Sequence, residues 1–166
     1  MAIDPAHARD DLPSGTASWP RSAAVVGVGL MGTGIAQLLA LSGIRTAIAD
    51  VNAEKARAGR ERAISTATEF SAAGLMSRDA PDLIADHVTA ARSIDEAAED
   101  AVFLVEAVTE SAHVKREVYR RVESVIAEEA VIATNTSAIP IHERGAALGR
   151  PGRFVGTHWF NPPQWI

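Results

Sequence analysis

Apolar and polar residues are arranged in two different patterns along this chain, and the two patterns predict strands and helices. Short continuous apolar runs are typical of strands buried on both faces of a parallel sheet. These runs occupy residues 23–29, 44–50, 101–108, 131–137 and 153–159, with a weaker run at 88–93. Apolar residues at helical spacing predict helices at 30–43, 53–74, 77–87, 111–130 and 139–149. Strands alternating with helices predict an α/β fold of the doubly wound Rossmann type, with a mostly parallel sheet and flanking helices.

Several predicted helices carry signals at their ends. In the helix at 30–43, Leu30 and Ile35 belong to the apolar face, and Ser42-Gly43 ends it. Asn52 is the expected N-terminal cap of the helix at 53–74, and Gly74 its expected stop. Residues 1–21 lack such a pattern, which predicts a flexible leader followed by one dinucleotide-binding domain at 22–166.

Composition narrows the classes of function. Hydrophobic residues make up 47% and charged residues 22% of the chain, as in ordinary globular proteins. The net charge of −5 and the lack of a basic stripe argue against a nucleic-acid partner. The chain has no cysteine, which excludes disulfides, thiolate metal sites and a cysteine nucleophile. No apolar run is long enough to span a bilayer, so we expect a cytoplasmic protein without a membrane partner.

The stretch VVGVGLMGTGIAQ contains the spacing G-x-G-x-x-G at Gly27, Gly29 and Gly32, between a predicted strand and a predicted helix. Gly27 allows a tight turn, Gly29 lets the backbone approach a pyrophosphate, and Gly32 lets helix and strand pack closely. The backbone N–H groups of the first helical turn, which includes Leu30 and Met31, would then hold the phosphates. A glycine turn without a ligand remains the alternative.

Asp50 supports a nicotinamide cofactor. It lies eighteen residues after Gly32, at the end of the second predicted strand, where a carboxylate accepts hydrogen bonds from the adenosine ribose. A carboxylate there would repel a 2′-phosphate, and the following Val51 and Asn52 offer no arginine to receive one. The pattern therefore favours NAD over NADP, while FAD shares the glycine motif.

Polar residues follow three later strands at the edge where ligands bind in open α/β sheets. They are Glu110 and Lys115, then Thr134, Asn135, Thr136 and Ser137, and finally His158 and Asn161. Each has an ordinary structural alternative, such as a charge in the first turn of a helix, a turn residue or a histidine at the end of a strand. Their convergence on one edge indicates a site that binds a small molecule. We assign no metal ligand.

Five segments together identify a family. VVGVGLMGTGIAQ, AIADVN, LVEAVTESAHVKREVY, ATNTSAIPI and RFVGTHWFNPP occur in the order and spacing of the NAD-binding domain of L-3-hydroxyacyl-CoA dehydrogenases. The resemblance extends from Ser22 to Pro163. It implies the NAD-dependent, reversible oxidation of a 3-hydroxyacyl thioester to the 3-ketoacyl thioester, a reaction of fatty acid metabolism.

The resemblance also implies roles for individual residues. His158 matches the family's catalytic base, which takes the proton of the 3-hydroxyl group while hydride leaves C3 for the nicotinamide. Histidine suits this role because it exchanges protons near neutral pH. Ser137 matches the serine that hydrogen-bonds the substrate oxygen, and Glu110 and Lys115 match residues that line the nicotinamide ribose. Two asparagines match positions near the nicotinamide and at the turn that contacts the substrate: Asn135 and Asn161.

Three departures from the family pattern bear on activity. The glutamate that orients the histidine, and the helical C-terminal domain that closes the acyl site and forms the dimer interface, have no counterpart within these 166 residues. We therefore expect the chain to be the cofactor-binding part of an enzyme, weakly active or inactive by itself. The sequence leaves open whether the chain forms a homo-oligomer. The third departure is the stretch AISTATEFSAAGL, which lacks the basic residues that contact CoA in the family, although Arg57, Arg60 and Arg62 precede it.

Two alternatives follow from these departures. One is a dehydrogenase of a 3-hydroxy acid that is not a thioester, such as carnitine or gulonate. Trp159 and the closing PPQWI, which differ from the usual HFFNP surroundings, are compatible with an unusual substrate. The other is an NAD-binding module without catalysis.

Overall fold

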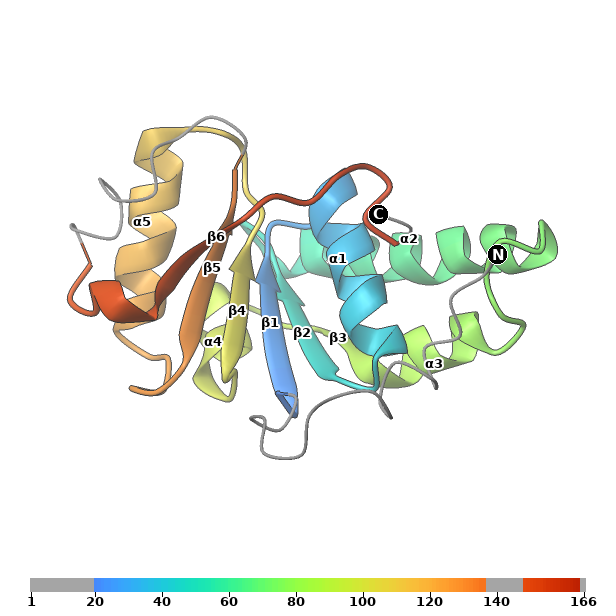
Figure 1. Ribbon diagram of the computed structural model, residues 1–166, viewed down its shortest axis with the longest axis horizontal. Coiled ribbons are helices and arrows are strands. Elements are labelled where there is room, and N and C mark those ends of the chain that lie inside the picture. Colours follow the sequence, from blue (N-terminus) through green and yellow to red (C-terminus); the bar gives the residue numbers. More distant parts are fainter. Residues whose placement is uncertain (1–19, 137–147, 165–166) are drawn as a thin grey trace.

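The computed structural model describes residues 20–136 and 148–164, and at its centre lies a sheet of six parallel strands (Figure 1). The first half of the chain forms β1 (Ser22–Val26), α1 (Leu30–Leu41), β2 (Arg45–Ala49), α2 (Ala53–Ala72), α3 (Ala80–His87) and β3 (Val88–Ala90). The second half forms α4 (Ile94–Glu99), β4 (Phe103–Glu106), α5 (Ala112–Glu123), β5 (Val131–Asn135), a 3-10 turn (Pro151–Arg153) and β6 (Phe154–Thr157). The predicted parallel, doubly wound α/β fold is confirmed.

The strand order, β3-β2-β1-β4-β5-β6, reverses direction between β1 and β4. The chain first builds outward from β1 to β3, then returns to place β4 on the other side of β1. At such a reversal the connections leave in opposite directions, which opens a crevice at the carboxyl ends of the two central strands.

The register of the sheet brings the ends of five strands level. Ala49 of β2 pairs with Val26 of β1, which pairs with Glu106 of β4 on its other side. Glu106 in turn pairs with Thr134 of β5, and Thr134 with Gly156 of β6. Residues immediately after this row therefore emerge at one edge of the sheet, which includes the crevice.

Helices cover both faces of the sheet, as Figure 1 shows: α1, α2 and α3 lie on one face, and α4 and α5 on the other. Strand β1 shows how the two layers arise, because successive side chains of a strand point to opposite faces. Ala23 and Val25 belong to the core cluster beneath α1–α3, whereas Ala24 and Val26 belong to the cluster beneath α4 and α5.

Most predicted element ends are close to the observed ones. Asn52 caps α2 by accepting a hydrogen bond from the backbone N–H of Lys55 at 2.9 Å, and Gly74 follows the helix with a φ of +71°. Leu30, predicted to face the core, is 69% exposed because it begins α1 at the crevice. The helix predicted to reach residue 130 ends at Glu123, where the chain starts to turn back toward β5.

Helix α4 was not predicted from the hydrophobic pattern, because its six residues are too few to show a helical period. A local signal is nevertheless present. The hydroxyl of Ser93 accepts a hydrogen bond from the backbone N–H of Glu96 at 3.1 Å, as a helix cap does. The predicted leader, apart from residues 20 and 21, lies outside the described residues, as does the predicted helix at 139–149 up to residue 147.

After β6 the chain turns back across α1 (Figure 1), as the Asn-Pro-Pro sequence predicts. A Cβ on Gly34 of α1 would approach Pro163 Cγ to 2.5 Å, so the absence of a side chain there admits the returning segment. The side-chain amide of Gln164 donates to the side chain of Gln37, which itself donates to the Ala63 carbonyl oxygen at 2.7 Å. Within the described ranges no helix is long and apolar enough to cross a membrane.

Candidate cofactor site and active-site edge

The glycine loop between β1 and α1 meets two steric requirements that a side chain would violate. Gly27 has a φ of +97°, and a Cβ there would lie 2.6 Å from the carbonyl oxygen of Ala107. A Cβ on Gly32 would lie only 1.8 Å from the carbonyl oxygen of Gly27. Both positions therefore need glycine for the loop to close, whether or not a ligand is bound.

Gly29 differs from its two neighbours in the motif. It is the N-cap of α1, its φ of −67° suits any residue, and no atom beyond its two chain neighbours lies within 4 Å of a Cβ built there. The space beside it is open at the start of a helix, where the first backbone N–H groups have no partner within the helix and favour an anion. The loop therefore fits a pyrophosphate at Gly29 while its other glycines maintain the fold.

Asp50, immediately after β2, lies against the same loop. One carboxylate oxygen accepts the backbone N–H of Val28 at 2.9 Å, and the other accepts the N–H of Val51 at 2.8 Å. The Val28 carbonyl oxygen accepts from the Thr33 hydroxyl at 3.1 Å and from the Arg62 guanidinium at 2.9 Å. Each carboxylate oxygen retains a lone pair after one hydrogen bond, so Asp50 fits the hydroxyls of an adenosine ribose.

The arginines of α2 have mainly structural partners. Arg60 donates to the carbonyl oxygens of Val88 and Ala85, both at 2.7 Å, and so ties α2 to β3 and α3. Arg62 donates to the glycine loop, as described above, and Arg57 is exposed. Of the three arginines that precede the stretch without basic residues, two thus hold backbone atoms of this domain.

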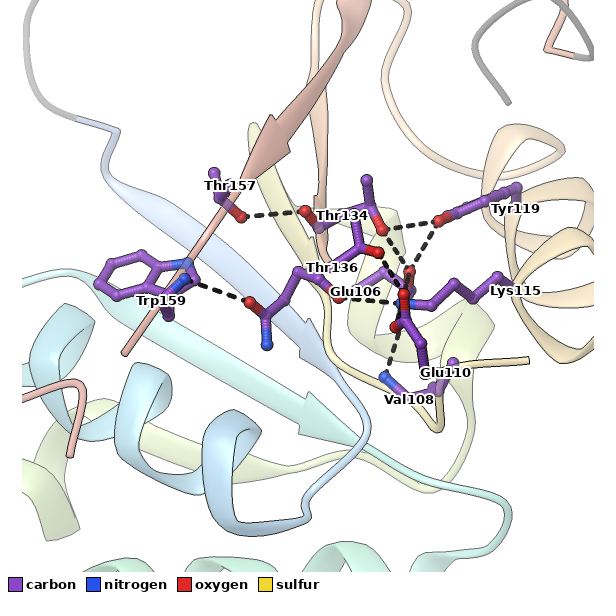
Figure 2. Close-up of polar contacts among 10 residues, drawn as sticks. Glu106, Val108, Glu110, Lys115, Tyr119, Thr134, Thr136, Thr157 and Trp159 are labelled. Atoms are coloured by element: carbon purple, nitrogen blue, oxygen red, sulfur yellow. Dashed lines mark hydrogen bonds and ion pairs between the residues drawn. The ribbon is translucent and has the colours of Figure 1, made fainter. Parts of the chain in front are cut away.

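A buried ion pair lies beneath the ends of β4 and β5 (Figure 2). The side chains of Glu106 and Lys115 are both 0% exposed, and the Lys115 ammonium donates to both Glu106 carboxylate oxygens at 2.9 Å. It also donates to the backbone carbonyl oxygen of Asn135 at 2.9 Å and lies 3.2 Å from a carboxylate oxygen of Glu110. Lys115, predicted to line the cofactor ribose, is thus directed into the protein in this structure.

Glu106 has further partners that the sequence analysis did not single out. Its carboxylate accepts the backbone N–H of Val108 at 2.8 Å, the Tyr119 hydroxyl at 2.6 Å and the Thr134 hydroxyl at 2.7 Å. The two hydroxyls lie 2.9 Å from each other. One signal could have revealed the site: Glu106 is a carboxylate within the apolar run AVFLVEAV, where an unpaired charge would be costly.

The polar residues above this ion pair connect β4, β5 and the segment after β6. The Thr136 hydroxyl donates to the Glu110 carboxylate. The Asn135 side-chain oxygen accepts the backbone N–H of Trp159 at 3.3 Å. The structure therefore gathers Glu110, Lys115 and Asn135 into one cluster, as the sequence predicted for residues at this edge.

His158 and Asn161 follow β6 at the same edge of the sheet and are exposed. The imidazole ring of His158 lies against the ring of Phe160, with centroids 4.7 Å apart. Ser137 lies outside the described residues. No cluster of three or more His, Cys, Asp or Glu residues suited to a metal ion occurs in residues 20–136 and 148–164.

Two ion pairs whose members have clearly shifted pKa values lie away from this edge, at α4 and α5. The pKa of Asp95 is lowered, chiefly by its hydrogen bond with Arg121, whose guanidinium donates at 2.6 and 2.9 Å. The pKa of Glu96 is lowered by hydrogen bonds from Arg92. Both pairs are largely exposed, so they contribute little to the site or to stability.

Comparison with known proteins agrees with this geometry. The family model for the 3-hydroxyacyl-CoA dehydrogenase NAD-binding domain matches residues 22–166. A 3-hydroxybutyryl-CoA dehydrogenase of Bradyrhizobium diazoefficiens is 32% identical over 138 residues, which cover 83% of this chain and 47% of the relative. The chain spans about half the length of the curated relatives it matches.

Solved structures show the same fold. The (S)-3-hydroxybutyryl-CoA dehydrogenase PaaH1 of Ralstonia eutropha superposes with a TM-score of 0.82 at 26% identity, over 89% of this chain and 52% of its own. A 5-formyl-3-hydroxy-2-methylpyridine 4-carboxylic acid 5-dehydrogenase, described as an NAD+-dependent dismutase, superposes with a TM-score of 0.74 at 32% identity. That match covers 88% of this chain and 46% of the dismutase.

Proposed function

Since this chain belongs to the family of 3-hydroxyacyl-CoA dehydrogenase NAD-binding domains, we propose that it is the cofactor-binding part of an enzyme that interconverts L-3-hydroxyacyl-CoA and 3-ketoacyl-CoA. The observation that carries the proposal is the level row of strand ends. It puts the open glycine loop, Asp50 and His158 on one edge of the sheet, where a dinucleotide and a substrate would meet.

The cofactor is held in this proposal by two groups of residues. Gly27, Gly29 and Gly32, with the first turn of α1 at Leu30 and Met31, bind the pyrophosphate, and Asp50 binds the adenosine ribose. Glu110 and Asn135 lie toward the nicotinamide half, above Lys115. Asp50 disfavours a 2′-phosphate, which selects NAD over NADP.

Bound NAD supplies the acceptor for the hydride that leaves C3 of the substrate. In the same direction of reaction the 3-hydroxyl group loses its proton to the imidazole of His158, which acts as the general base. Ser137 hydrogen-bonds the substrate oxygen, and Asn161 shapes the turn beside it. The exposure of His158 in this structure leaves its ring accessible to a substrate.

The substrate class has two candidates. A short 3-hydroxyacyl-CoA is the first, because the curated relatives at 32% identity are named as 3-hydroxybutyryl-CoA dehydrogenases. A hydroxy compound that is not a thioester is the second. It is favoured by the 32% identity to the pyridine carboxylic acid dehydrogenase and by the structural partners of Arg60 and Arg62, which leave few cations of α2 for CoA phosphates.

The proposal is tested in two steps, cofactor first. Titration of the 166-residue chain with NADH, followed by nicotinamide fluorescence, should show saturable binding, with much weaker binding of NADPH. The chain is then joined to the second half of the Bradyrhizobium relative, and NADH oxidation is measured with acetoacetyl-CoA and with free 3-keto acids. We expect turnover with the thioester, and very weak or no turnover by the chain alone.

Each outcome has a distinct meaning. Absence of NADH binding would contradict the assignment of the cofactor. Turnover with free acids only would favour the substrate that is not a thioester. Binding of NADH without turnover in either protein would favour an NAD-binding module without catalysis, and robust turnover by the chain alone would contradict the need for a second half.

A further inference from the structure

The carbonyl oxygen of Val28, between the first two glycines of the loop, accepts hydrogen bonds from two side chains. The Thr33 hydroxyl donates at 3.1 Å and the Arg62 guanidinium at 2.9 Å. Thr33 belongs to the helix that the loop opens, whereas Arg62 lies 34 residues farther along the chain, on α2. The sequence analysis placed Arg62 only among three cations that precede a stretch without basic residues. The contact of a positive charge with the glycine loop is therefore a feature that the tertiary structure adds.

Close packing of α2 on the loop makes this contact possible. Gly59 is buried, and a Cβ built there would lie 2.6 Å from the Cβ of Val28. Arg62 follows three residues later and so lies on the same side of the helix. Its side chain is exposed, and holding an exposed arginine in one orientation costs side-chain entropy comparable to what one hydrogen bond contributes. Folding stability alone therefore gives little reason for the contact.

The peptide bond between Val28 and Gly29 connects this contact to the open space at the start of α1. The bond is trans, so its carbonyl and N–H groups lie in one plane and point in opposite directions. Because Arg62 and Thr33 hold the carbonyl oxygen, the Gly29 N–H is directed away from both. Among the described residues no acceptor bonds to that N–H. A hydrogen bond from a cation to the carbonyl also polarises the peptide, which makes its N–H a stronger donor.

We propose that Arg62 is a positioning residue, which fixes and polarises the Val28–Gly29 peptide so that the Gly29 N–H donates to the pyrophosphate of the cofactor. Arg62 acts through the peptide, and Thr33 supports the same orientation without a charge. The inference rests on the proposed function, since it assumes that the pyrophosphate lies at Gly29. It adds a residue of α2 to a part of the site that the sequence assigned to the glycine loop alone.

The experiment compares ligands with and without phosphate. NADH and ADP both carry a diphosphate, whereas adenosine has only the base and the ribose. Dissociation constants for the three ligands are measured on the 166-residue chain by NMR titration, together with its melting temperature. A residue that only maintains the fold would affect all three ligands alike. The amide proton resonance of Gly29 in the chain without ligand reports how strongly its peptide is polarised.

The main variant is Arg62→Met, which removes the guanidinium and keeps an unbranched apolar side chain. We expect NADH and ADP to bind about tenfold more weakly, the size of one lost hydrogen bond to a charged group, and adenosine to change by less than about twofold. The Gly29 amide resonance should move upfield, because its peptide is less polarised. The matched control is Arg57→Met, which removes the same charge from an exposed position of α2. It should leave the three constants within about twofold and the Gly29 resonance in place.

Thr33→Val provides a second variant, which decides the test if Arg62→Met does not fold. It removes the other donor to the Val28 carbonyl oxygen and leaves the guanidinium in place. We expect a loss in the same direction, about threefold for NADH and ADP, with adenosine binding unchanged. Unaltered constants for NADH and ADP, or an equal loss of adenosine, overturn the inference in either variant. So does a selective loss in Arg62→Met with an unmoved Gly29 resonance, because Arg62 would then contact the diphosphate itself.

Failure of the proposed function gives a different result. If the unaltered chain binds neither NADH nor ADP, the glycine loop holds no pyrophosphate, and the proposed function falls together with the inference. If the unaltered chain binds both ligands and Arg62→Met behaves as Arg57→Met does, only the inference falls.

Discussion

At the end of β1 the edge of the sheet is shaped by the backbone of the glycine loop, with the Asp50 side chain after β2, whereas at the ends of β4 and β5 polar residues are bonded to a buried ion pair. Gly27 and Gly32 allow the loop at β1 to close because a Cβ would meet carbonyl oxygens at 2.6 and 1.8 Å. At β4 and β5 the geometry depends on charged groups instead: Lys115 donates hydrogen bonds to Glu106 and to the Asn135 carbonyl oxygen at 2.9 Å.

The two regions should therefore respond to different kinds of substitution. Added volume harms the region at β1, since its geometry depends on van der Waals exclusion between backbone atoms. Changes of charge or of hydrogen bonding at constant volume should harm the region at β4 and β5. In the proposed arrangement of NAD, affinity for the adenosine half and function at the nicotinamide half should therefore be separable, and the following substitutions test how far that separation holds.

The largest expected effect is on turnover. In the protein that joins this chain to the second half of a relative, His158→Gln should lower kcat by roughly 100- to 10,000-fold, the usual contribution of a general base. The dissociation constant for NADH should stay within about twofold, because His158 lies beyond β6, away from the glycine loop. His113→Gln, which changes an exposed histidine of α5, is the matched control. A large loss of NADH affinity in His158→Gln would mean that the histidine is structural.

The next effect separates folding from binding within the glycine loop. Gly32→Ala should destabilise the chain by about 1–3 kcal/mol or more, because its Cβ collides with the Gly27 carbonyl oxygen. Gly29→Ala should leave the melting temperature unchanged and weaken NADH about tenfold, since its Cβ enters the open space beside α1. Thermal unfolding and NADH titration of both variants provide the test. Equal destabilisation by the two substitutions would contradict the distinction between them.

The smallest effect concerns Asp50. Asp50→Ala should weaken NADH up to about tenfold by removing the acceptor for the ribose hydroxyls, and Asp50→Asn should weaken it less. Both variants should also bind NADPH better relative to NADH, because the carboxylate that repels a 2′-phosphate is gone. Fluorescence titration with the two nucleotides measures the ratio, with Asp86→Ala, an exposed aspartate of α3, as control. An unchanged ratio would show that Asp50 serves only to hold the N–H groups of Val28 and Val51.

Much of the fold was predictable because its signals are local. The apolar runs of β1, β4 and β5, the Asn52 cap and the Gly74 stop each depend on a few consecutive residues. The failures arise where tertiary context decides. Leu30 has the right spacing for the apolar face of α1, but its position at the crevice leaves it exposed. Helix α4 is too short for periodicity, and only its cap at Ser93 marks it.

For the candidate site, positions along the chain could be predicted from the sequence, but contacts between side chains could not. The residues at strand ends were identifiable because parallel strands deliver them to one edge. The buried contacts of Glu106 were missed, since a glutamate within an apolar run does not reveal its partners. Lys115 was found by position, but its direction was not, because a lysine one turn into a helix can point toward a ligand or into the protein.

By itself the sequence determined the succession of the six strands and of the helices between them apart from α4, the glycine loop, the acid at Asp50 and the set of polar residues after β4, β5 and β6. These features follow from steric limits and spacings within short segments of chain. Only the tertiary structure decided that Lys115 is buried against Glu106 and bonded to Asn135, and that Asn135 reaches the backbone beside His158. The physical reason is register: these contacts require β4, β5 and β6 to be level, and only the paired sheet brings residues so far apart in the chain to one place.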